Sequence, residues 1–154
     1  MRILFLVVNL VLLAACGGRK HAALEDLTGH EDLSFFKPGS VQGTRDGDRL
    51  DTQALFTDSS SMLTVQMRFE IGAPTRLVSG LWRWTRNNGA TSGTVAERSV
   101  DFLGGQSGPP SFGGTFDLLF DGTPRYRIRI PLTELTNRLN RPPDWLRSLP
   151  STRP

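Results

Sequence analysis

The chain has 154 residues, of which 38% are hydrophobic, and a formal net charge of +3. This length accommodates one ordinary domain, and the recurring apolar residues exclude a wholly disordered chain. Acidic residues are interspersed among the basic ones, so we expect no nucleic-acid-binding surface. The single cysteine, Cys16, excludes a fold held together by intramolecular disulfides, so the fold depends on its hydrophobic core.

The N-terminus has the features of an export signal. Arg2 supplies a positive charge, and residues 3–15 form an apolar run interrupted only by Asn9. At thirteen residues this run is shorter than the roughly 20 that a membrane-spanning helix needs, so a signal peptide over residues 1–15 is favoured over a retained transmembrane anchor. Small residues stand directly before Cys16, as signal peptidases require beside the bond they cleave.

The stretch Leu13-Ala14-Ala15-Cys16 resembles the bacterial lipobox. This resemblance, which covers only the first 16 residues, implies that Cys16 receives a diacylglyceryl group on its sulfur and becomes the new N-terminus. It also implies a lipid-anchored protein of the cell envelope, because two or three acyl chains make release from the bilayer negligible. In Gram-negative lipoproteins an Asp after the cysteine favours retention at the inner membrane, whereas this chain has Gly17. We therefore expect the protein to be anchored at the periplasmic face of the outer membrane.

The mature chain divides into three parts. Residues 16–47 are polar and interrupted by glycine and proline, which predicts a lipidated N-terminus followed by a flexible tether. Within this tether, residues 22–27 could form one turn of helix. Residues 48–140 are expected to form the domain, and residues 141–154 a tail rich in Pro and Arg.

The domain contains a series of short segments with the two-residue periodicity of strands. In residues 62–71, apolar side chains stand at every odd position, with mostly polar ones between them. Asp121-Gly122 between two apolar runs predicts a hairpin. No helical pattern separates the strands, so we predict an all-β fold, a small antiparallel β-sandwich or partial barrel. The predicted strands cover residues 51–56, 62–71, 76–85, 95–103, 115–120 and 125–132.

The last predicted strand has an arginine ladder on one face, formed by Arg125, Arg127 and Arg129. After it, a helical spacing of leucines over residues 132–139 predicts a short C-terminal helix that closes the domain. The glycine-rich stretch of residues 104–114 lacks the ending of a phosphate-binding loop. We expect it to be a flexible connection between strands and a candidate contact site.

Residues able to perform catalysis are scarce in the predicted domain. Both histidines, His21 and His30, fall in the tether, which argues against a Ser-His-Asp site or a zinc site on the strands. The segment Asp46-Gly47-Asp48, with Asp51, has the wrong spacing for a calcium loop. We therefore expect a protein that is not an enzyme and that holds no metal or cofactor. A glycosidase-like carboxylate pair is the weaker alternative, and its candidates are Glu70, Glu97, Asp101 and Asp117.

Two binding functions are consistent with these observations. The first is a membrane-anchored lipoprotein whose β-domain binds or scaffolds another cell-envelope component, foremost a protein. The second uses Trp82 and Trp84, which lie two residues apart and so on one face of a strand. Exposed indoles there could stack on a glycan or hold a small ligand, whereas buried indoles would belong to the core. Trp145 in the tail is a further candidate contact residue.

We predict that Cys16→Ser moves the protein from the membrane fraction to the soluble fraction, because the substitution removes the sulfur that carries the lipid. Cell fractionation followed by immunoblotting measures this distribution. A variant that stays in the membrane fraction would contradict the lipid anchor. The alternative, an ordinary secretory signal followed by a chance cysteine, predicts that the unchanged protein is already soluble.

Overall fold

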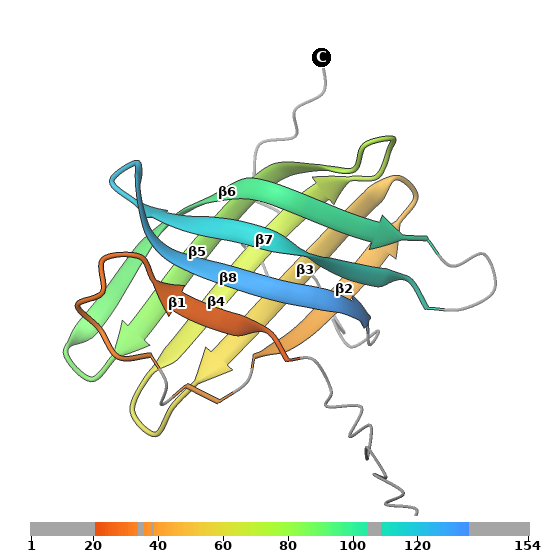
Figure 1. Ribbon diagram of the computed structural model, residues 1–154. Helices are drawn as coiled ribbons and strands as arrows, with labels where there is room; N and C mark the ends of the chain where they lie inside the picture. The colour runs from red at the N-terminus through yellow and green to blue at the C-terminus, as the bar shows by residue number, and fades with distance from the viewer. Residues whose placement is uncertain (1–20, 34–35, 38, 105–108, 136–154) are drawn as a thin grey trace, which may run out of the picture.

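The structure, a computed structural model, describes residues 21–33, 36–37, 39–104 and 109–135. This part of the chain consists of β-strands joined by turns and loops (Figure 1). Most strands have apolar side chains at alternate positions, the pattern of a strand with one buried face. The strands are β1 (Ala23–Asp26), β2 (Ser40–Asp46), β3 (Arg49–Thr57), β4 (Met62–Glu70), β5 (Arg76–Arg86), β6 (Gly89–Leu103), β7 (Ser111–Phe120) and β8 (Thr123–Glu134).

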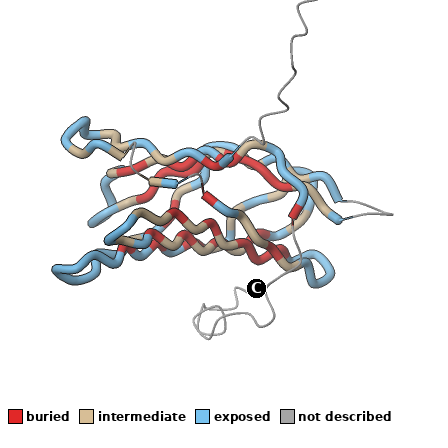
Figure 2. The backbone as a smooth tube through the Cα atoms, turned by 90° about the horizontal axis from the view of Figure 1, so that it is seen from below, coloured by how far each residue is buried: buried red, intermediate tan, exposed pale blue. Residues whose placement is uncertain are grey.

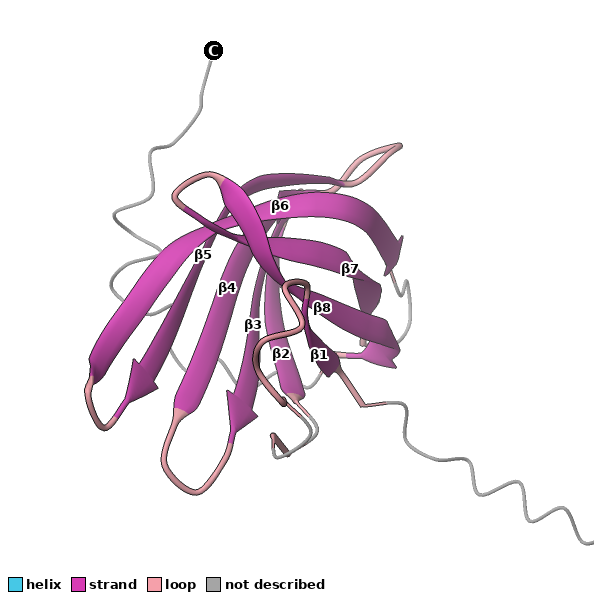
Figure 3. Cartoon of the chain, turned by 60° about the vertical axis from the view of Figure 1, so that its left-hand side comes forward, coloured by secondary structure: helices cyan, strands magenta, loops and turns pink. Residues whose placement is uncertain are grey.

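All eight described strands belong to one antiparallel sheet, in the order β1-β8-β7-β6-β5-β4-β3-β2. The sheet curls into a half-barrel, as Figure 3 shows. The residues directly before its two edge strands, β1 and β2, form an isolated bridge, in which the Gly39 N–H donates to the Ala22 carbonyl oxygen at 3.2 Å. The prediction of an all-β antiparallel fold is confirmed, and of the two architectures considered the partial barrel is the one observed.

The core lies between the two halves of the curled sheet. Along β4, the odd-numbered residues from Leu63 to Phe69 are fully buried, as the period-two pattern predicts. The Phe69 ring meets those of Phe112 and Phe116 on β7, with centroids 5.0 and 5.7 Å apart. Figure 2 shows buried positions on both halves of the curled sheet. Burying each such side chain contributes about 1.5–3 kcal/mol.

The β7–β8 hairpin turns at Asp121 and Gly122, as the sequence predicts. Both residues have a positive φ, 47° and 77°, the combination that a two-residue type I′ turn requires. Gly122 adopts this conformation easily because it has no Cβ. The turn sets Phe120 opposite Thr123, so that Phe120 ends β7 at one end of the half-barrel.

The segment expected to be a flexible tether contributes two strands to the sheet. β1 pairs with β8 and β2 pairs with β3, so the sheet begins at Ala23 rather than after Gly47. Most of residues 22–27, where a helical turn was the expectation, form β1 instead. The glycines there are not simply linker residues: a Cβ on Gly43 would lie 2.7 Å from Leu135 Cδ1. Short strands with few apolar residues give little periodic signal, which explains why the sequence pattern does not reveal them.

Two expectations in the C-terminal half also differ from the structure. Gly113 and Gly114 lie inside β7 rather than in a loop. The backbone of β6 approaches β7 so closely there that a Cβ on Gly114 would collide with the Ser99 carbonyl oxygen. Leu132 lies in β8, so the predicted helix does not begin there. Residues 133 and 134 of the expected helix also lie in β8, whereas its residues 136–139 and the Pro- and Arg-rich tail lie outside the described residues. In the described ranges, no helix is long and apolar enough to cross a membrane.

Gly93 of β6 provides a test of how closely the curled sheet packs. A Cβ there would collide with the Leu119 carbonyl oxygen and lie 2.6 Å from Trp82 Nε1. We predict that Gly93→Ala lowers the free energy of unfolding by about 1–3 kcal/mol, as overpacking does. Urea denaturation followed by tryptophan fluorescence measures this change. Gly72→Ala is the control, because the nearest atom to its Cβ would be 3.4 Å away; equal losses in both variants would contradict the prediction.

Candidate functional site

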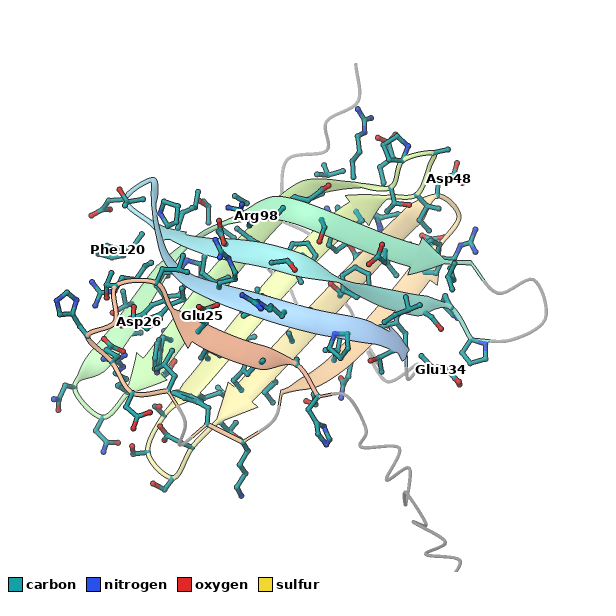
Figure 4. All side chains as sticks on the ribbon, in the orientation of Figure 1. Glu25, Asp26, Asp48, Arg98, Phe120 and Glu134 are labelled. Atoms are coloured by element: carbon teal, nitrogen blue, oxygen red, sulfur yellow. The ribbon has the colours of Figure 1, made fainter. Side chains whose placement is uncertain are left out.

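One end of the half-barrel carries a pocket of about 210 Å³, hereafter the rim pocket. The β1–β2 connection, the β5–β6 hairpin and the β7–β8 hairpin all contribute to it. In Figure 4 the labels of Phe120 and Asp26 mark this end of the molecule, and those of Asp48 and Glu134 mark the opposite end. The lining residues are Glu31, Trp82, Trp84, Arg86, Thr91, Phe120, Arg125 and Tyr126.

The floor of the rim pocket is aromatic. Trp82 and Trp84 of β5 stand edge-on to Tyr126 of β8, with ring centroids 5.9 and 5.0 Å from that of the tyrosine. The Trp82 indole N–H donates to the Leu119 carbonyl oxygen at 2.8 Å. Only 2% of Trp82 and 3% of Trp84 is exposed. The two tryptophans are therefore core residues beneath the pocket, and neither offers an open ring face on which a sugar could stack.

Three polar side chains converge on the Glu31 carboxylate in the wall of the rim pocket. Arg86 Nη2 donates to Oε2 at 2.8 Å. The Tyr126 hydroxyl donates to Oε1 at 3.2 Å, and Arg125 Nη2 donates to the same oxygen at 3.4 Å. The Arg86 guanidinium also lies over the Trp84 ring, 3.9 Å from its centroid. Because the Glu31 side chain is 27% exposed, these ion pairs lie at the mouth of the pocket.

Two buried N–H groups of the rim pocket, Trp84 Nε1 and Arg125 Nε, have no hydrogen-bond partner among the described residues. An unsatisfied buried donor costs about 1–3 kcal/mol, so both groups would gain from an acceptor. Burial and the charge of Glu31 raise the pKa of Tyr126, which keeps its hydroxyl protonated as a donor. The pocket therefore combines many donors with a single carboxylate, that of Glu31.

A tight turn after β1 positions Glu31. The Asp26 carboxylate accepts hydrogen bonds from three backbone N–H groups, those of Thr28 (2.9 Å), His30 (2.8 Å) and Glu31 (2.7 Å). The Thr28 hydroxyl donates to it as well. Partial burial raises the pKa of Asp26, but these hydrogen bonds outweigh that effect and hold the pKa at about 2. Asp26 is therefore ionised at neutral pH and orders the backbone that carries Glu31.

The carboxylates that could form a glycosidase-like pair contribute to the sheet instead of the rim pocket. Glu70 pairs with Arg76 at 2.8 Å, and Glu97 accepts the Leu77 N–H at 2.6 Å. Asp101 is exposed on β6. These three residues and Asp117 are not among the lining residues of the rim pocket, so the structure does not bring them together there.

Asp117 holds part of the arginine ladder predicted on β8. Its side chain is 7% exposed, and the carboxylate binds Arg127 at 2.7 Å and Arg98 at 3.1 Å. Burial raises the pKa of Asp117, but the two guanidinium groups outweigh this effect and hold the pKa below its usual value. The other ladder arginines also have acidic partners: Arg125 pairs with Glu31 and Arg129 with Glu25.

The remaining sequence candidates lie elsewhere. Asp51 pairs with Arg68 at 2.8 Å, which is a structural role. Across the residues that the structure describes, no group of three His, Cys, Asp or Glu side chains could hold a metal ion. His21 and His30 are exposed, and His30 lies in the Asp26 turn. Cys16 and Trp145 lie outside the described residues.

Glu31 and Arg86 give no local signal in the sequence, and Arg125 is visible there only as part of the ladder. Glu31 and Arg125 are 94 positions apart, so only the folded sheet brings them together. The one usable local signal is Asp26 followed by Thr28, a pair typical of a side-chain-capped turn. Comparison with family models, with curated proteins and with solved structures gives no match to this chain. The function must therefore be inferred from the site.

The low pKa of Asp26 leads to a pH-dependent prediction. A depressed carboxyl pKa contributes stability above its unfolded value, 3.8, that is lost as the pH falls through about 2. We predict that Asp26→Asn lowers the melting temperature at neutral pH, and that its difference from the unchanged protein shrinks between about pH 5 and pH 2. Thermal denaturation across this range measures the effect.

Hydrogen exchange supplies the control for this prediction. The Glu31 amide should exchange faster in Asp26→Asn, because the carboxylate that accepts its N–H is lost. Asp58→Asn changes a similar turn, in which Asp58 accepts the N–H groups of Ser60 and Ser61. That variant should leave exchange at Glu31 unchanged. If the difference in melting temperature between Asp26→Asn and the unchanged protein did not vary with pH, the ionised Asp26 carboxylate would not be what stabilises the turn.

Proposed function

We propose that the protein is a lipid-anchored component of the cell envelope whose β-domain is a non-enzymatic binding module, with the rim pocket as its contact site. The lipobox-like signal supports the anchor and, through Gly17, the outer membrane. The observation that carries the binding function is an aromatic floor that lies beneath several donors, two of them buried and unsatisfied among the described residues. Apolar pockets with a few placed polar groups, at the mouth of a curled sheet, are typical ligand sites.

The polar groups of the rim pocket suit binding better than catalysis. Glu31 is the one carboxylate among the lining residues, and its oxygens already accept hydrogen bonds from Arg86, Arg125 and Tyr126. The other polar groups are donors with fixed directions, because they lie on strands whose backbones are paired. Such groups orient a ligand and give it specificity.

A protein partner is the second candidate, favoured by the splay between β5 and β6. Among the described residues these strands pair only from Leu81 of β5 onward. The backbone of residues 76–79 therefore has no strand partner on that side, apart from the Leu77 N–H bond to Glu97, whereas Gly80 is buried against Val95 of β6. Val78 is 40% exposed beside this open edge. An extended segment of a partner could add to such an edge as a strand.

Site-specific crosslinking in intact cells tests the proposal. We predict that a photo-crosslinking amino acid at Phe120, which is 43% exposed at the rim pocket, captures an envelope component. Leu103 is the control position, because it is 60% exposed and is the last residue of β6, whereas the first residues of β6 lie at the rim pocket. Mass spectrometry of the adduct reports whether a small ligand, a glycan or a protein has been captured.

A third crosslinker position, at Val78, tests the second candidate. A protein adduct at Val78 without any adduct at Phe120 would favour strand addition and overturn the rim pocket as the contact site. Labelling at Phe120 but not at Leu103 supports the rim pocket. Equal labelling at those two positions, or none at either, would contradict the proposed function.

A further inference from the structure

The Glu31 carboxylate occupies the polar part of the rim pocket, although it belongs to none of the strands that form the floor. It comes from the β1–β2 connection and accepts hydrogen bonds from Arg86, Arg125 and Tyr126, at 2.8, 3.4 and 3.2 Å. Guanidinium groups and hydroxyl donors are the groups with which proteins bind carboxylates. Glu31 therefore has the contacts that the carboxylate of a bound ligand would have.

The aromatic floor adds a second element of recognition. Trp84 and Tyr126 lie in contact with the two arginines, Arg86 over the Trp84 ring and Arg125 near the Tyr126 ring. Trp84 is 3% exposed, and its Nε1 has no partner in the described part of the chain, so it can donate to an acceptor that enters the pocket. At the rim of the pocket, Phe120 is 43% exposed, so its open ring can pack against a flat apolar group.

The size of the rim pocket favours a small ligand. Its volume, about 210 Å³, is below the roughly 300–1,000 Å³ of pockets that hold drug-sized molecules. A molecule with one ring and a short acidic side chain matches the rim pocket by itself, whereas a larger ligand would also have to enter the adjoining hollow of about 500 Å³, which shares Glu31, Trp84 and Arg86 with it.

We propose that the rim pocket binds a small carboxylate that carries an aromatic or apolar group, and that Glu31 fills the carboxylate position until such a ligand displaces it. This inference rests on the proposed binding function and names the ligand class of the same site. Displacement requires only that the Glu31 side chain leaves the two arginines, because Arg86 and Arg125 belong to paired strands, whereas Glu31 does not. Glu31 competes with the ligand's carboxylate for Arg86 and Arg125. Because Glu31 belongs to the same chain, its effective concentration at the two arginines is high.

Titration with three acids, benzoate, phenylacetate and 3-phenylpropionate, tests the inference through intrinsic tryptophan fluorescence. We expect Glu31→Gln to bind at least one acid about tenfold more tightly than the unchanged protein, because the internal competitor has lost its charge. Adding Arg125→Met to Glu31→Gln should abolish this gain. The corresponding neutral amides should bind weakly and equally to all variants, because they lack the charge that the arginines recognise.

Matched controls come from the outer surface of the same sheet. Glu25 and Arg129 form a similar ion pair, 3.1 Å long, between β1 and β8, and neither residue lines the rim pocket. Glu25→Gln and Arg129→Met should therefore leave acid binding unchanged. Thermal denaturation verifies that each variant is folded. Should Glu31→Gln fail to fold, NMR titration of the unchanged protein replaces it: the signals of Glu31 and Arg86 must shift with the acid and not with its amide.

The outcomes separate this inference from the proposed function. Failure of Glu31→Gln to bind any of the three acids, or equal binding of acids and amides, would overturn the ligand class. The hydrogen bonds of Glu31 would then serve only to hold the β1–β2 connection against the sheet. A Phe120 adduct in cells would still support the binding module. Acid binding without a Phe120 adduct would instead support the ligand class and contradict the cellular role.

Discussion

Tyr126 of β8 stands edge-on to both tryptophans of β5, and this contact joins the two halves of the sheet at the end where the rim pocket opens. In the sheet order β6 and β7 separate β5 from β8, so the three rings can meet only because the sheet curls. The same packing that closes the core therefore builds the floor of the pocket. Glu31 reaches the pocket because the curl also brings the β1–β2 connection over this end.

The curl in turn depends on positions where a side chain would not fit. Gly43 leaves room for Leu135, and Gly93 leaves room for Trp82 to donate to the Leu119 carbonyl oxygen. These glycines lie within paired strands. Glycine is otherwise unfavourable there, because it loses more backbone entropy on folding than other residues and has no side chain to pack. Their cost is offset by the contacts they allow between the two halves of the sheet.

The sequence predicts the strands whose alternation reflects their own buried face, and it misses those that depend on distant partners. The expected strand of residues 62–71 corresponds to β4, Met62–Glu70, because one face of that segment is apolar throughout. β1 has no such face and exists because it pairs with β8, about a hundred residues later. The candidate site divides in the same way. That Trp82 and Trp84 share a face follows from local geometry, whereas their burial depends on Tyr126, which the sequence cannot place.

If Cys16 is lipidated as proposed, the position of β1 also limits how far the domain can lie from the membrane. On the proposed lipidation of Cys16, only six residues separate the anchor from Ala23, the first residue of the sheet. Six residues span roughly 20 Å at full extension, so the domain would stay near the lipid headgroups instead of moving on a long spacer. β1 runs from this anchor toward Asp26, whose turn carries Glu31. On that proposal the rim pocket would open away from the bilayer and meet dissolved molecules rather than those embedded in the lipid.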